Sequence, residues 1–225
     1  MTIDELYRFV QFVSNKEQRG YVRPTEFNLL AKRGQLDLIK DRVGKTSKDS
    51  QAEGYKVTSA LFDELYPVIV TARSLATSNS VYIFPDDYLY FLGFSAGTPA
   101  RAVEIISHGE LYKRRDSSLV RPSPDFPVGV IGGIIGTNVA QGVRLYTPTQ
   151  STTPTGLLDY VKEPHDPVWN FVVVNDVEVY SATGSVQLEL PESTHMEIAH
   201  RILGYIGVNL RESDMVQYST AITKE

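Results

Sequence analysis

The hydrophobic residues of this chain are spaced as in helices at both ends and as in strands in the middle. Apolar side chains recur at intervals of three and four residues between Ile3 and Val13, which predicts an amphipathic helix. Between Val68 and Leu190, short β-branched and aromatic runs are separated by glycine, proline and asparagine, a pattern typical of strands joined by turns. After Pro191 the helical spacing returns. The sequence therefore predicts an α+β fold.

Local signals mark the predicted N-terminal helices. Thr2-Ile-Asp-Glu5 has the pattern of a capping box, in which the Thr hydroxyl and the Glu carboxylate each accept a hydrogen bond from a backbone amide. A second helix is predicted to begin at Pro24 and to place its apolar residues between positions 27 and 39. Gly34 is a weak point inside that helix. The polar, turn-rich residues 44–56 are predicted to form a loop.

The elements of the middle region follow from propensity and from turn signals. A short helix is predicted over 59–66, stopped by Pro67, and a short polar helix or turn over 109–116. Asn175-Asp176 is predicted to close a hairpin. The predicted strands, all short and rich in β-branched or aromatic residues, are 68–71, 81–84, 103–106, 128–131, 142–146, 157–162, 169–174, 177–180 and 186–190.

The C-terminal part is predicted to be helical and to pack back on the N-terminal helices. One helix is predicted to run from Pro191 to Gly207, and a last helix to begin at Arg211. The predicted inward residues of the first of these are Met196, Ala199, Ile202, Leu203 and Ile206. The two ends are expected to form a terminal helical bundle, and the middle an antiparallel β region, within one structural unit. The predicted parts are an N-terminal helical part, a β-rich central region and C-terminal helices, at 1–66, 67–190 and 191–225.

The segment Val81–Gly97 has the highest aromatic density in the chain and allows two interpretations. In the first, Pro85-Asp86-Asp87 ends a strand and caps a short buried helix over Tyr88–Leu92. In the second, Gly93-Phe94-Ser95-Ala96-Gly97 is the G-x-S-x-G motif of serine hydrolases, with Ser95 as the nucleophile on a strand-to-helix turn. The first interpretation makes the segment structural, and the second makes it catalytic.

The context of Ser95 favours the structural interpretation. Pro99 follows too closely for a long helix to begin cleanly at Ser95, and the chain downstream lacks the alternation of strands and helices that the hydrolase fold requires. The acid and the histidine of a catalytic triad occur in the required order, as Asp159 or Asp176 followed by His195, but this order is the only support for them. A five-residue pattern also arises easily by chance. No catalytic residue is therefore predicted, and Ser95 is expected at the exit of a helix.

No cofactor or metal site is predicted. The chain contains no cysteine, which excludes disulfides, thiolate metal sites and cysteine nucleophiles. His195 and His200 are five residues apart, whereas a helical zinc pair is four apart, and His165 lies in a predicted turn. The glycine-rich residues 129–142 lack the G-K-[ST] ending of a phosphate loop, so they are predicted to be a hairpin tip that buries against a neighbouring subunit. Lys113-Arg114-Arg115 is expected to be a solvated basic run.

The charge balance bears on partners and location. With 22 basic and 27 acidic residues the net charge is −5, which disfavours a protein whose main role is to bind nucleic acid. Residues 1–56 carry +3 and the remainder −8, a polarity that suits head-to-tail contacts between subunits. No secretory signal and no apolar run of the roughly 18 residues needed to cross a bilayer is visible. A soluble protein made in a cytoplasm, with no membrane partner, is expected.

Several segments occur together in a distinctive order along most of the chain, at 4–21, 24–31, 84–88, 186–191 and 203–218. None of them is a catalytic signature, so their weight comes from their order and their joint presence. In this respect the chain resembles the neck and tail ring proteins, or head–tail connector proteins, of crAss-like bacteriophages that infect Bacteroidetes.

The resemblance implies a non-enzymatic structural protein of the virion neck or tail, made in the cytoplasm of the bacterial host. Such proteins form closed homo-oligomeric rings, here expected to be about twelvefold, in which each subunit contacts its neighbours through two different surfaces. The expected further partners are the portal protein, the adjacent neck or tail ring proteins, and DNA that passes through the lumen without sequence-specific binding. The alternatives are another virion role, as a capsid-auxiliary or tail-tube protein, and a serine hydrolase that uses Ser95.

Overall fold

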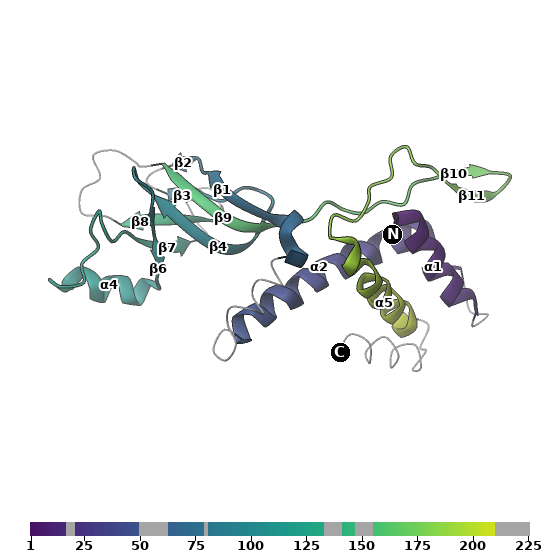
Figure 1. Cartoon of the computed structure of the whole chain (residues 1–225), viewed down its shortest axis with the longest axis horizontal. Helices are drawn as coiled ribbons and strands as arrows, with labels where there is room; N and C mark the ends of the chain where they lie inside the picture. Colours follow the sequence, from purple (N-terminus) through teal and green to yellow (C-terminus); the bar gives the residue numbers. More distant parts are fainter. Residues whose placement is uncertain (17–20, 50–62, 79–80, 133–140, 147–154, 210–225) are drawn as a thin grey trace. The chain divides into compact units, whose positions relative to one another are not determined.

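A computed structural model describes residues 1–16, 21–49, 63–78, 81–132, 141–146 and 155–209 (Figure 1). The chain is an α+β protein with helices from both termini and strands between them, which confirms the predicted fold class. It divides into two compact units, one formed by Met1–Val68 with Pro164–Glu225 and the other by Ile69–Glu163. Residues 164–190, which the sequence groups with the β-rich region, thus belong to the first unit.

The first unit contains the helices α1 (Ile3–Lys16), α2 (Pro24–Asp49) and α5 (Glu192–Asn209), the 3-10 helix η1 (Tyr66–Val68), and a hairpin of β10 (Phe171–Val174) and β11 (Val177–Tyr180). Helix α5 contacts both α1 and α2, so the helices of the two chain ends share one core (Figure 1). The buried apolar residues that α1, α2 and α5 contribute to it are Ile3, Leu6, Tyr7, Val10, Phe27, Ala31, Leu38, Ile39, Ile198, Ala199, Ile202, Leu203 and Ile206. No helix in the described part of the chain is long and apolar enough to span a membrane.

The predicted helix signals are present at the N-terminal end of this unit. Glu5 N donates to Thr2 Oγ1 at 3.2 Å, and Thr2 N donates to Glu5 Oε2 at 2.8 Å, which together form the predicted capping box. Helix α2 begins at Pro24, as predicted. Gly34 is buried where α5 approaches: a Cβ added there would lie 3.4 Å from Ile198 Cγ2. The predicted weak point of the helix is therefore a helix–helix contact.

Two helices run further than predicted. Helix α2 continues through Asp49, so the predicted loop is wrong for residues 44–49, and its remaining residues lie outside the described ranges. Helix α5 continues past Gly207 to Asn209, so the predicted stop is also wrong. In both places a glycine was taken as a boundary, but a helix without proline tolerates glycine at a cost of about 1 kcal/mol.

Smaller differences concern the ends of the helical unit. Met196 is 44% exposed, so it does not face inward as predicted. Of the predicted helix at 59–66, residues 63–65 are helical and lead into η1, while 59–62 lie outside the described ranges. The helix predicted to begin at Arg211 lies outside them as well.

The second unit consists of two sheets and one helix, α4 (His108–Asp116). Its strands are β1 (Ile69–Ser74), β2 (Thr77–Ser78), β3 (Val81–Ile83), β4 (Tyr88–Ala96), β5 (Arg101–Ala102), β6 (Glu104–Ile105), β7 (Val128–Gly132), β8 (Gly142–Tyr146) and β9 (Gly156–Lys162). One sheet has the order β1-β9-β4-β5 and the other β2-β3-β8-β7-β6; only the β6–β7 pair is parallel among the described strands. Both sheets contribute to one core, made of Tyr82, Phe84, Phe94, Ala96, Val103, Val143, Leu145, Leu158 and Tyr160.

Most predicted strands are confirmed, but the helix predicted over Tyr88–Leu92 is wrong, because these residues begin strand β4. Register shifts between Tyr88 and Tyr90 and between Phe91 and Gly93 interrupt the ladder with β9. Such bulges break the period-two alternation that identifies a strand in a sequence. Asp87 does not cap a helix: its carboxylate accepts a hydrogen bond from the Tyr160 hydroxyl at 3.0 Å.

Two further predictions can be assessed in part. The strand predicted at 186–190 is wrong, since only Val186 forms a β-bridge, with Val168. Strands β7 and β8 form the predicted antiparallel pair. Residues 133–140 of the tip between them lie outside the described ranges, and with them the predicted burial of that tip against a neighbouring subunit.

Candidate functional site

Ser95 does not lie on a nucleophile elbow. It lies inside β4, paired with Leu157 of β9 on one side and with Ala102 of β5 on the other. An elbow requires a sharp turn from a strand into a helix, and β4 continues through Ala96 instead. The prediction that Ser95 lies at the exit of a helix is also wrong, for the same reason.

The acids and the histidine considered with Ser95 have other local contacts. The Asp159 carboxylate accepts a hydrogen bond from Ala72 N at 2.7 Å, at the bulge in β1 where Ala72 has a positive φ of 53°. Asp176 lies in the β10–β11 turn. His195 Nδ1 is 2.8 Å from Met1 O and its Nε2 is 2.9 Å from Leu190 O, so the ring joins the N-terminus to the start of α5. Ser95 and Asp159 belong to the second unit, and Asp176 and His195 to the first.

The histidines considered above as metal ligands have separate surroundings. His165 Nδ1 lies 3.0 Å from Glu189 Oε2, and the His165 side chain is exposed. His195 and His200 both lie on α5, and His195 is engaged with backbone carbonyl oxygens as described above. Within the described ranges, no group of three or more histidine and acidic side chains is placed to hold a metal ion.

Trp169 anchors the β10–β11 hairpin to the helices. It is 3% exposed, and its ring lies against Tyr7 of α1 (centroids 4.3 Å apart), Phe171 (5.9 Å) and Tyr180 (5.8 Å). Its Nε1 donates to Asp4 Oδ1 at 3.0 Å. The base of the hairpin therefore stacks on the aromatic surface of the helical unit.

Three polar residues of α2, Asn28, Lys32 and Gln35, form a polar stripe that holds the chain segment leading to the hairpin. The Asn28 side chain accepts a hydrogen bond from Trp169 N at 2.8 Å and donates one to Trp169 O at 3.3 Å. It therefore pairs with both backbone groups of residue 169, as the backbone of a neighbouring strand does. Lys32 pairs with Asp166 at 2.8 Å. Gln35, which is 1% exposed, donates to His165 O at 3.3 Å. Positions 28, 32 and 35 lie on one face of a helix, so one face of α2 holds this segment in a single register.

Ion pairs also join α5 to α2. Glu197 of α5 accepts from Arg42 at 2.7 Å and from Arg201 at 2.9 Å. Arg42 also pairs with Glu64 at 2.7 Å, and Arg201 with Asp41 at 2.8 Å. The Arg42 and Arg201 side chains are only 18% and 10% exposed, so loss of a carboxylate partner would leave a largely buried charge. These ion pairs therefore link α5 to α2.

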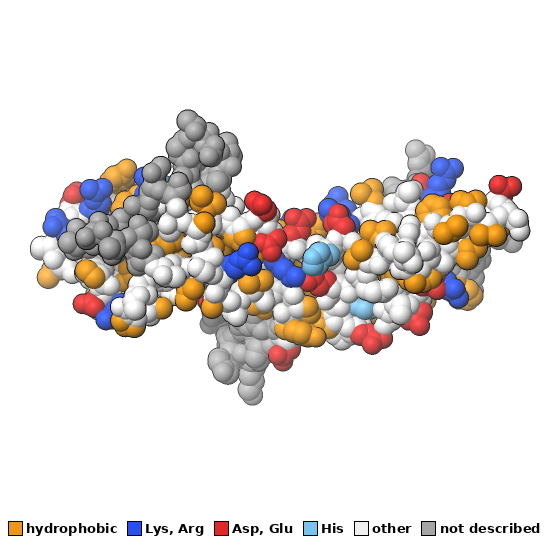
Figure 2. All heavy atoms as spheres, turned by 90° about the horizontal axis from the view of Figure 1, so that it is seen from above, with side chains coloured by type: hydrophobic (Ala, Val, Ile, Leu, Met, Phe, Trp, Pro, Cys, Tyr) orange, Lys and Arg blue, Asp and Glu red, His pale blue; other side chains and the backbone are white. Residues whose placement is uncertain are grey.

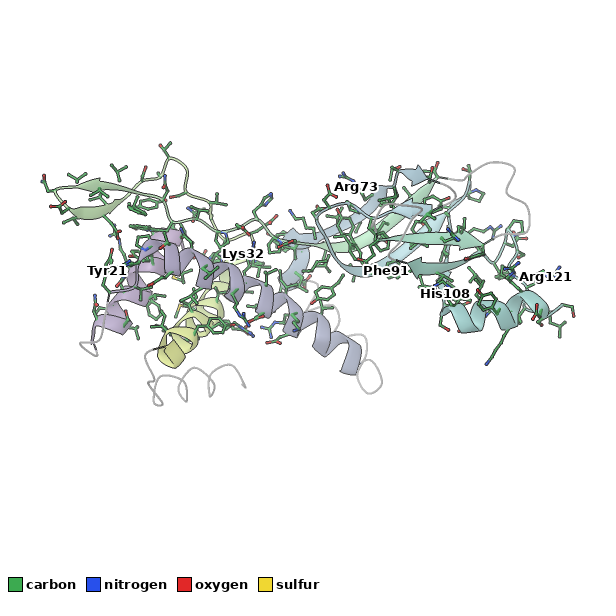
Figure 3. All side chains as sticks on the ribbon, turned by 180° about the vertical axis from the view of Figure 1, so that it is seen from behind. Tyr21, Lys32, Arg73, Phe91, His108 and Arg121 are labelled. Carbon is green, nitrogen blue, oxygen red and sulfur yellow. The ribbon has the colours of Figure 1, made fainter. Side chains whose placement is uncertain are left out.

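The two faces of the hairpin differ in what covers them. In the observed register Phe171 pairs with Tyr180 and Val173 with Glu178, so these residues share the face that meets Trp169 and Tyr21. The Tyr21 hydroxyl donates to the Glu178 carboxylate; partial burial and this bond raise the pKa of Tyr21, which keeps it protonated as the donor (Figure 3). One end of the hairpin is thus tied to Tyr21, in the segment before α2.

The opposite face consists of valines alone and is called the valine face below. Val172 pairs with Val179 and Val174 with Val177 across the two strands. Their exposed fractions are 55%, 48%, 51% and 61%, and Figure 2 shows hydrophobic side chains gathered over this hairpin. A two-stranded sheet is marginally stable in water, and one with a bare apolar face indicates a surface meant to be covered.

A second exposed surface, called the α4 patch below, lies on α4 and the segment that follows it. Its exposed apolar residues are Tyr112, Leu119, Val120 and Phe126, with exposed fractions of 62%, 94%, 57% and 78%. Its exposed cations are Lys113, Arg115 and Arg121 (Figure 3 labels Arg121 beside α4). The patch therefore combines apolar and basic groups.

Buried and charged contacts hold α4 in place. Leu111 is 2% exposed and packs with Ile106, Val128 and Val130. The Ser107 hydroxyl accepts from Glu110 N at 3.3 Å and caps the helix. On the other side, Arg114 donates to the Glu104 carboxylate through two nitrogens, at 2.6 and 2.8 Å, and this pairing lowers the pKa of Glu104.

Sequence reasoning located the hairpin but missed the valine face. The available signal was Val172-Val173-Val174, a continuous apolar run in the predicted hairpin. For the α4 patch the signal was Leu119-Val120 within an otherwise polar segment. No protein-family model matches the sequence, and no curated protein matches it either.

Proposed function

We propose that this protein is a non-enzymatic structural protein of a tailed bacteriophage virion, where it forms an oligomeric ring in the connector between portal and tail and continues the DNA channel. The valine face carries the proposal: it is an apolar surface on a hairpin that Trp169 and the polar stripe of α2 hold, and its four valines are 48–61% exposed. Exposed apolar patches of this kind mark contacts with other proteins. The resemblance of 4–21 and 203–218 to connector ring proteins supports this type of assembly.

A ring requires two different surfaces on each subunit, so that every copy binds one neighbour on each side. The valine face in the first unit and the α4 patch in the second unit meet this requirement. The proposed partners are further copies of the chain in a ring of about twelve, the portal protein and the adjacent neck or tail rings. DNA passes through the lumen, and the net charge of −5 supports weak contact with its phosphates, since tight binding requires Lys and Arg.

Two alternatives remain in view. Another virion role, as a capsid-auxiliary or tail-tube protein, would use the same exposed surfaces. A serine hydrolase would use Ser95, and the position of Ser95 inside β4 weighs against it. A fluorophosphonate probe separates the hydrolase from the structural roles, because labelling that is lost in Ser95→Ala would support the enzyme.

Electron microscopy tests the ring directly. Purified protein, alone and with the portal protein, is expected to give ring-shaped class averages with a rotational symmetry, and mass spectrometry of virions is expected to detect the chain. In the assembled ring, a lumen lined mainly by Lys and Arg would contradict the weak contact with DNA. A protein that stays monomeric in both preparations and is absent from virions would refute the proposal.

A further inference from the structure

The hairpin offers apolar and acidic groups but no cation. Residues 171–180 contain Asp176 and Glu178 and no Lys or Arg. Asp176 lies in the turn directly before Val177 of the valine face. Two hairpins packed valine face to valine face would bury apolar surface, but neither would provide a cation for the Asp176 carboxylate beside the valine face of the other. The better match is a surface that is both apolar and basic.

The α4 patch has this composition. Lys113, Arg115 and Arg121 form no ion pair with any residue in the described ranges, whereas Arg114 between them is held by Glu104 and Glu110. Arg121 Nε donates to Arg115 O at 3.2 Å, so these two residues stay close together. Glu110 and Asp125 are paired with Arg114 and Arg101, so Asp116 is the one carboxylate of residues 108–126 set against these three cations, and the patch keeps a net positive charge beside exposed apolar side chains.

We propose that the valine face of one subunit packs on the α4 patch of a second copy of this chain. This inference rests on the proposed ring, because it identifies the contact between neighbouring subunits. The valines cover Leu119, Val120 and Phe126, and Asp176 lies near the cations of the patch. Each bound copy keeps one free valine face or one free α4 patch, so the contact is heterologous and repeats from copy to copy until the ring closes.

One pair of substitutions on each surface tests the contact without disturbing the fold. On the hairpin, Val172→Thr with Val179→Thr keeps β-branched side chains at a cross-strand pair and places two hydroxyl groups in the interface. On the patch, Lys113→Glu with Leu119→Ser reverses one exposed charge and removes an apolar side chain that is 94% exposed. Each variant is expected to weaken self-association at least about tenfold, which sedimentation velocity and mass photometry measure.

Each surface has a matched control in its own unit. Val173→Thr makes the same change on the same strand, at a valine that is 59% exposed but lies on the other face of the hairpin. Arg144→Glu reverses another exposed cation of the second unit, in β8. Both controls are expected to assemble like the wild type, and thermal unfolding of all four variants is expected to match the wild type.

Mixing the two interface variants gives the decisive result. Each retains one intact surface, so the hairpin variant and the patch variant, mixed at a concentration at which each is monomeric alone, are expected to form a one-to-one dimer that grows no further. High salt is expected to weaken this dimer, because part of the contact is electrostatic. If the wild type forms rings and the patch variant self-associates as strongly, the valine faces pair with one another and the inference is overturned. If the wild type forms rings and both variants self-associate as strongly, the inference is overturned as well.

The outcomes separate this inference from the proposed function. Rings that form in virions and in purified protein regardless of both variants would leave the proposed function standing and refute the contact. Assembly that depends on both surfaces, in a protein absent from virions, would support the contact and refute the connector role. A wild-type chain that stays monomeric at every concentration, with or without the portal protein, would overturn the contact.

Discussion

Replacement of Gly156 by alanine tests the packing of the two sheets in the second unit. Gly156 is the first residue of β9, and it is buried. A Cβ added there would lie 2.5 Å from Tyr82 Cδ1 and Cε1 and 2.8 Å from Phe94 Cζ. Tyr82 and Phe94 are 0% and 5% exposed and belong to the shared core of the two sheets, so neither ring can swing into solvent.

The expected magnitude follows from two opposing effects. Overpacking of a filled core costs about 1–3 kcal/mol, because the rings or the β9 backbone must shift. The smaller conformational freedom of alanine in the unfolded chain offsets about 0.4–1 kcal/mol of this. The free energy of unfolding of the second unit is therefore expected to fall by about 1–2 kcal/mol. For a domain of this size that lowers the Tm by roughly 5–15 °C.

Differential scanning calorimetry measures this change, and amide hydrogen exchange in β9 assigns it to the second unit. Gly132→Ala is the matched control: Gly132 also lies in a strand, but no atom lies within 4 Å of its added Cβ. It is expected to be neutral or slightly stabilising. A Gly156→Ala protein as stable as the control would mean that the Tyr82 ring does not pack on Gly156, and would refute the arrangement of the two sheets.

Three further predictions concern the helical unit and α4. Gly34→Ala is expected to raise the free energy of unfolding by up to about 1 kcal/mol in thermal unfolding, because the helix gains alanine and the new Cβ makes ordinary contacts with Ile198 and Arg201; a loss of stability would mean that α5 packs too closely on Gly34 to admit a methyl group. Glu197→Gln is expected to cost about 1–2 kcal/mol, less than the loss of a fully buried pair, because each of its arginine partners keeps another carboxylate; unchanged stability would refute a structural role. Because Arg114 lowers the pKa of Glu104 below 4.5, the ionised pair adds stability above that pH and loses it as the pH falls through the lowered pKa. An NMR titration of Glu104 is expected to move back toward 4.5 in Arg114→Gln, and an unmoved titration would exclude the pair.

Features that depend on contacts between residues close in the sequence could be predicted from the sequence. The capping box at Thr2 and Glu5, the start of α2 at Pro24 and the Asn175-Asp176 turn depend on contacts within a few residues. Both turn residues have positive φ values, of 50° and 60°, which Asn and Asp tolerate better than most residues do. These features were therefore predictable without knowledge of the rest of the chain.

Features that depend on contacts between residues far apart in the sequence could not be predicted from it. Residues 88–92 form a strand because β9 pairs with them, and the bulges in that ladder hide the strand pattern. Val172 and Val174 look like core residues of a strand, and only their exposed fractions of 55% and 51% show that no described element packs on their face of the hairpin. The valine face could not be predicted from strand propensity for this reason. It is defined by its exposure, because no element in the described part of the chain packs on it.

The Trp169–Asp4 hydrogen bond provides a test of how firmly the hairpin is held. Trp169→Phe removes the bond from Nε1 to the Asp4 carboxylate, and it leaves a small cavity beside Tyr7. The loss of a hydrogen bond to a charged group, together with the smaller ring, is expected to cost about 2–3 kcal/mol. Asp4→Asn is the matched control, because it keeps an acceptor oxygen, and it is expected to cost less than about 1 kcal/mol.

The functional consequence appears in the hairpin itself. Faster amide exchange is expected for Val172 and Val179 in Trp169→Phe, with weaker self-association, because a loosened hairpin must be ordered again on binding. As Trp169 is the only tryptophan and is 3% exposed, the wild type is expected to show the blue-shifted emission of a buried indole, which Asp4→Asn should preserve. Exchange rates in the hairpin that do not differ between Trp169→Phe and the wild type would show that the bond from Trp169 Nε1 to Asp4 is not needed to hold the valine face. Asn28→Ala would then be expected to release it, since Asn28 is the side chain that bonds both backbone groups of residue 169.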